Sequence, residues 1–69
     1  MKTQKIKTVK AKNVDFGSQL AVFFQDGYEM LEVSSFARNS DTEIDITVEH
    51  KGQEIILQYG LEDQVQIAM

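Results

Sequence analysis

The acidic side chains are the first residues of this sequence that could do chemistry. Asp41, Glu43 and Asp45 alternate along the chain, as the first ligands of a calcium-binding loop do. Such a loop needs a glycine directly after the third acid, but Ile46 stands there. The same alternation is typical of the solvated face of a β-strand, and we adopt this interpretation. The pattern therefore predicts neither a metal site nor a catalytic pair of carboxylates.

The single histidine, His50, is the other candidate for catalysis. A serine nucleophile would need this imidazole beside its hydroxyl group, together with an orienting acid. The serines lie in other segments, none of them in a nucleophile elbow: Ser18, Ser34, Ser35 and Ser40. The four glycines are too widely spaced to form a phosphate-binding loop. We therefore expect a non-enzymatic protein without a cofactor, in which His50 is an exposed residue beside a turn.

Charge is distributed very unevenly along the chain. Five of the seven Lys and Arg residues fall within the first twelve positions, and no acid precedes Asp15. The remainder carries all eleven acids against only Arg38 and Lys51, a formal charge of −9. The sequence thus predicts a basic N-terminal arm, residues 1–12, followed by an acidic body.

The length of 69 residues predicts a single domain, residues 1–69, with a small core. Such a chain buries only about 60% of its unfolded surface, so small domains often need disulfides, metals or partner subunits. Cysteine is absent, which leaves self-association as the expected source of further burial. No apolar run is long enough to span a membrane, and no apolar segment follows the N-terminal lysines as in a signal peptide. We therefore expect a cytoplasmic protein without a membrane partner.

The clearest structural element covers residues 42–50. Ile44, Ile46 and Val48 alternate with polar residues, which is the pattern of a half-buried strand. Lys51-Gly52 then predicts a two-residue hairpin turn, and residues 53–59 the returning strand. This register places the apolar residues of both strands on one face, in three opposing pairs: Val48 with Ile55, Ile46 with Leu57, and Ile44 with Tyr59.

A second hairpin is predicted around Asp26-Gly27, with a type I′ turn and arms at residues 19–25 and 28–36. One face of these arms carries Leu20, Val22, Phe24, Leu31 and Val33, with Glu29 at its rim. The other face carries Ala21, Phe23, Tyr28, Met30 and Phe36, mixed with Glu32 and Ser34. Strands that are apolar on both faces are usually covered on both sides.

The remaining elements complete an all-β fold. Residues 5–11 read as a first strand in which a bulge corrects the phase between Ile6 and Val9, and residues 65–69 as a last short strand. We expect a small antiparallel meander of five or six strands, forming a barrel or rolled sheet. The alternative for residues 28–38 is a short helix, although its apolar residues would spread around the helix instead of forming a stripe.

These features favour a protein-binding module that self-associates, forming a homodimer. It would act as an inhibitor or adaptor, of the kind that phages or mobile elements encode, by occluding the surface of a protein partner. The predicted partner-binding residues combine the aromatic face with acids that suit a basic groove. They are Phe23, Tyr28, Met30, Phe36, Glu43, Asp45, Glu49 and Glu54.

The alternative function is nucleic-acid binding by a small barrel. The lysines of the arm would neutralise phosphates, and exposed aromatic residues would stack on bases. The candidate lysines are Lys5, Lys7, Lys10 and Lys12. Against this, the acidic body would repel a phosphate backbone, and lysines along a strand also protect a sheet edge from aggregation.

Overall fold

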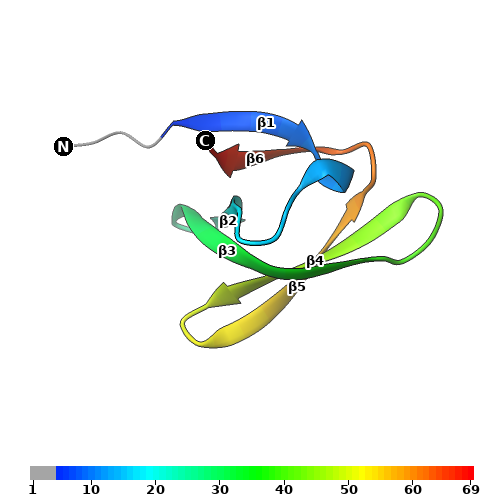
Figure 1. Ribbon diagram of the computed structural model, residues 1–69. Helices are drawn as coiled ribbons and strands as arrows, with labels where there is room; N and C mark the ends of the chain where they lie inside the picture. Colours follow the sequence, from blue (N-terminus) through cyan, green and yellow to red (C-terminus); the bar gives the residue numbers. More distant parts are fainter. Residues whose placement is uncertain (1–4) are drawn as a thin grey trace.

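The computed structural model describes residues 5–69 and shows an all-β protein, as predicted (Figure 1). Six strands and one short 3-10 helix follow one another along the chain. They are β1 (Ile6–Lys10), η1 (Ala11–Asn13), β2 (Gln19–Phe24), β3 (Gly27–Arg38), β4 (Glu43–His50), β5 (Gln53–Gly60) and β6 (Gln64–Ala68).

The strands form one antiparallel sheet in the order β1-β6-β2-β3-β4-β5. Strands β2 to β5 make a meander, and β6 returns across the molecule to lie between β1 and β2. The sheet rolls around its inner face, which carries the core, without closing into a barrel (Figure 1). Consequently β1 and β5 are its two edge strands.

The β4–β5 hairpin has the predicted register. The three predicted apolar pairs are all present: Val48 with Ile55, Ile46 with Leu57, and Ile44 with Tyr59. Lys51 and Gly52 both have positive φ, 52° and 78°, as the central residues of a type I′ turn require. The alternation and the turn residues together therefore fix this register.

The β2–β3 hairpin has the predicted faces but a different turn. Phe24 pairs with Gly27, so the central turn residues are Gln25 and Asp26. Among the described non-glycine residues only Lys51 has positive φ, so the predicted type I′ turn is wrong. Gly27 instead closes the turn with a φ of 134°.

A β-bulge divides β3 into two halves. Val33 pairs with Val48 and Ser35 with Thr47, so Ser34 is an extra residue on β3. The Ser34 hydroxyl donates a hydrogen bond of 3.3 Å to the backbone carbonyl of Thr47. The bulge reverses the phase of the strand, because side chains alternate between the two faces of a sheet.

Because of this change of phase, the position predicted for Phe36 is wrong. The residue pairs with Ile46, packs against the core and stacks on Phe16 with ring centroids 4.5 Å apart. It therefore leaves the outer face on which we expected it. The bulge predicted between Ile6 and Val9 is wrong, since β1 pairs regularly with β6. The helix considered for residues 28–38 is also wrong, because β3 spans them.

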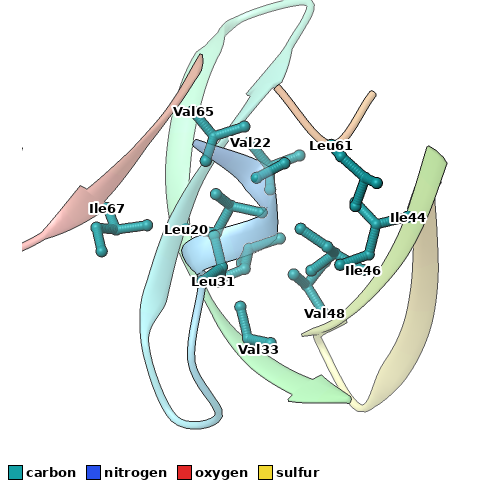
Figure 2. Close-up of a cluster of buried hydrophobic side chains, with 12 residues drawn as sticks. Leu20, Val22, Leu31, Val33, Ile44, Ile46, Val48, Leu61, Val65 and Ile67 are labelled. Atoms are coloured by element: carbon teal, nitrogen blue, oxygen red, sulfur yellow. The ribbon is translucent and has the colours of Figure 1, made fainter. Parts of the chain in front are cut away.

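The core lies inside the roll and draws on every strand. Figure 2 shows its side chains pointing toward one another from β2, β3, β4 and β6. Backbone bonds tie the connecting segments to it: the Ala11 amide donates to the Asp63 carbonyl at 2.8 Å, and the Leu61 amide to the Thr42 carbonyl at 2.8 Å. The buried residues of this core cluster are Ala11, Val14, Leu20, Val22, Leu31, Val33, Ile44, Ile46, Val48, Leu61, Val65 and Ile67.

The contrast between Ile46 and Ile56 gives a direct test of this arrangement. Ile46 is fully buried, whereas Ile56 on the opposite face of the β4–β5 hairpin is 68% exposed. We expect Ile46→Val to lower the free energy of unfolding by about 1 kcal/mol, and Ile56→Val by less than about 0.5 kcal/mol. Urea denaturation of both variants measures the difference. Equal losses would contradict the assignment of inner and outer faces.

Candidate functional site

The outer face of the β4–β5 hairpin is acidic. It brings together the four acids predicted to bind a partner: Glu43, Asp45, Glu49 and Glu54. Glu49 lies directly opposite Glu54 across the two strands. Asp45 faces Gln58, whose side-chain amide donates to Asp45 Oδ1 at 3.4 Å. We call this surface the acidic face.

The acidic face carries acids without ion pairs and one exposed apolar side chain. None of its four acids forms an ion pair within the part of the chain that the structure describes. Ile56 lies opposite Thr47 in the middle of the face and is exposed. Sequence reasoning missed Ile56, although the alternation that turns Ile55 and Leu57 inward must turn it outward. The face therefore combines unpaired negative charge with one apolar side chain.

A second outer face, on β2, β3 and β6, carries exposed aromatic residues, with the polar Glu32, Gln64 and Gln66 on the same side of the sheet. Phe23 and Tyr28 pair across the strands with ring centroids 5.7 Å apart, and they are 70% and 51% exposed. Ala21 pairs with Met30 beside them. The structure thus unites three of the predicted aromatic and methionine residues and excludes Phe36. We call this surface the apolar face.

A depression of about 440 Å³ opens on the apolar face where β2 and β6 separate. These strands pair only at Leu20 and Ile67, and beyond that pair they diverge. The half-buried Tyr59 reaches the depression from the core side, and burial raises the pKa of its hydroxyl group. The lining consists of Thr8, Ala21, Phe23, Tyr59, Gln64, Val65 and Gln66.

The lysines of the N-terminal arm are partly neutralised by the protein itself. Lys10 Nζ lies 2.7 Å from Glu62 Oε1, and Lys12 Nζ lies 2.6 Å from Glu62 Oε2. Hydrogen bonds from both ammonium groups lower the pKa of Glu62 to about 2. Two of the four lysines considered for nucleic-acid binding are therefore already paired with an acid.

The other arm lysines lie at or beside the edge strand β1. Lys7 is within the strand, and the carbonyl of Lys5 accepts a bond of 2.9 Å from the amide of Met69. Lys2 lies outside the described residues. Lysines on an edge strand hinder pairing with other chains, because a neighbouring strand would have to bury their charge.

His50 is not the exposed turn residue that we expected. It is the last residue of β4, on the same side of the strand as Ile46 and Val48, and only 20% of its side chain is exposed. Its ring stacks on Phe24 with centroids 5.0 Å apart, and its Nδ1 lies 3.8 Å from Glu29 Oε2. The imidazole is thus partly buried against Phe24.

Comparisons with known proteins leave the site to be interpreted from its own geometry. A scan against models of protein families finds no match, and neither a search of curated proteins nor one of solved structures finds any. Within residues 5–69, no three His, Asp or Glu side chains are grouped so that they could hold a metal ion. Nor does that part of the chain contain a helix with the length and apolarity needed to cross a membrane.

The depressed pKa of Glu62 predicts how the ion pairs respond to pH. Because the folded pKa, about 2, is below the ordinary value of 4.5, the carboxylate stabilises the fold above pH 4.5. This contribution is lost as the pH falls from 4.5 to about 2. Glu62→Gln should therefore be slightly less stable than the parent at pH 7 and equally stable near pH 2, as measured by thermal unfolding.

Asp15→Asn is the matched control, since Asp15 is an exposed acid without an ion pair in the described residues. The difference in stability between this variant and the parent should not shrink in this way between pH 7 and pH 2. High salt should also shrink the effect of Glu62→Gln, because exposed ion pairs are screened. A stability difference that is the same at pH 7 and pH 2 would contradict this account.

Proposed function

We propose that this protein is a non-enzymatic binding module that occludes a cationic surface on a protein partner, as an inhibitor or adaptor does. The acidic face is the observation that carries the proposal. Its four acids lie together on one hairpin without an ion pair in the described residues. A partner with a basic groove would supply the missing positive charge.

The pairing of Glu49 with Glu54 supports this function. Like charges placed directly opposite one another on a sheet are unfavourable, at about 0.2–1 kcal/mol. In the described residues neither carboxylate forms an ion pair with a cation. A lysine or arginine from a partner would relieve the repulsion between the two acids. The binding free energy would then include both the new attraction and the relief of the repulsion. The same charges would steer a basic partner toward this face before contact.

Ile56 adds an apolar contact to this electrostatic attraction. It is 68% exposed and surrounded by polar neighbours, with Glu54 and Gln58 on its own strand and Thr47 across from it. Protein interfaces commonly place an apolar anchor at the centre and polar groups at the rim. The acidic face has this arrangement on a small scale.

A displacement assay tests the proposal with poly-L-lysine as the cationic surface. A fluorescent single-stranded oligonucleotide is bound to poly-L-lysine, and the protein is added until fluorescence anisotropy reports its release. Glu49→Gln/Glu54→Gln should need about five times more protein than the parent, since two exposed charge contacts at roughly 0.5 kcal/mol each are lost. The variant should remain folded and no less stable, because it removes a repulsive pair.

Asp15→Asn/Asp26→Asn is the control, because it removes the same formal charge from exposed turns outside the acidic face. It should displace the oligonucleotide nearly as well as the parent. If both double variants lose the same activity, net charge alone explains the binding and the proposed role of the acidic face is wrong. Direct binding of the oligonucleotide to the protein would favour the nucleic-acid alternative instead.

A further inference from the structure

The aromatic residues of the apolar face project from the sheet beside a depression. Phe23 projects from β2 with 70% of its surface exposed, and it is also one wall of the depression. Tyr28 lies across from it on β3 and is 51% exposed. A projecting aromatic side chain and a neighbouring hollow on one surface can interlock with the same surface of a second molecule.

The depression is large enough for an aromatic side chain. Its volume of about 440 Å³ lies within the range of roughly 300–1,000 Å³ found for sites that hold whole small molecules. The buried Val65 and the half-buried Tyr59 line it from the core side. An inserted ring would therefore extend the core through the gap between β2 and β6.

The charge of this face points to a second copy as its occupant. Among residues 5–69 no charged residue lines the depression, and its polar lining residues are Thr8, Gln64 and Gln66, besides the Tyr59 hydroxyl. In a two-fold dimer the same patch meets itself, so a patch of one charge would repel its own copy. The acidic face could not meet itself for this reason, whereas the uncharged surface around the depression can, with the carboxylate of Glu32 beyond Met30 on the same face. An uncharged contact surface lets a chain of −4 overall meet its copy with less repulsion.

We propose that the apolar face binds a second copy of this chain in a two-fold dimer, in which Phe23 of each copy enters the depression of the other. The dimer covers the exposed ring of Tyr28 as well. It also supplies the additional burial that a domain of this size commonly obtains by oligomerisation. The proposal uses a different face from the proposed function, so either can fail alone.

Sedimentation equilibrium of Phe23→Ser and Ile56→Ser tests the dimer. Both substitutions remove an apolar side chain of similar exposure, 70% and 68%, from the outside of a strand. The parent and Ile56→Ser should sediment at twice the chain mass of 7.9 kDa. Phe23→Ser should bind its copy at least about tenfold more weakly and sediment as a monomer, with an unchanged circular dichroism spectrum.

Phe23→Trp gives an independent readout, because the natural chain contains no tryptophan. Its emission should shift to shorter wavelength as protein concentration rises, while that of Ile56→Trp should not. A parent that stays monomeric at millimolar concentration would overturn the proposal, as would dissociation by Ile56→Ser but not by Phe23→Ser. An emission shift that requires added oligonucleotide would overturn it in favour of base stacking.

Discussion

The pairing of β3 with both β2 and β4 is the interaction on which the rest of this structure depends. The strand spans 12 residues, and its neighbours change at the bulge between Val33 and Ser35. On one side of the bulge Leu31 and Val33 point inward, and on the other Phe36 does. One extra residue thus lets a single strand curve around the core and present apolar side chains to it from Leu31 to Phe36.

The parts of the fold that the sequence predicts are those set by local pattern. Alternation and the Lys51-Gly52 turn predict the β4–β5 register and hence the acidic face. The apolar spacings Ile6 to Val9 and Val33 to Phe36 are identical, yet only the second contains a bulge. β1 lies at an edge and can leave Ile6 on its outer side, whereas Phe36 must meet Ile46 in the core. The pairing of each strand in the folded sheet decides which spacing contains a bulge, so the local sequence pattern could not predict it.

The separation of charge along the sequence becomes a separation across the sheet. The lysines of β1 lie at one edge, the acidic face covers the other end, and the apolar face lies between them on β2, β3 and β6. Glu62 links the basic edge to the turn before β6 by pairing with Lys10 and Lys12. The depression arises from the divergence of β2 and β6, whose pairing is non-local. The outer surface thus offers two chemically distinct faces, which we propose bind a cationic partner and a second copy.

Backbone amide shifts in a nuclear magnetic resonance titration test most directly the claim that these faces act separately. Raising the protein concentration should move the amides of Phe23, Tyr28 and Gln66, which surround the apolar face. Adding poly-L-lysine at fixed concentration should instead move those of Glu49, Glu54 and Ile56. Shifts at one common set of residues in both titrations, or shifts confined to β1, would contradict the account.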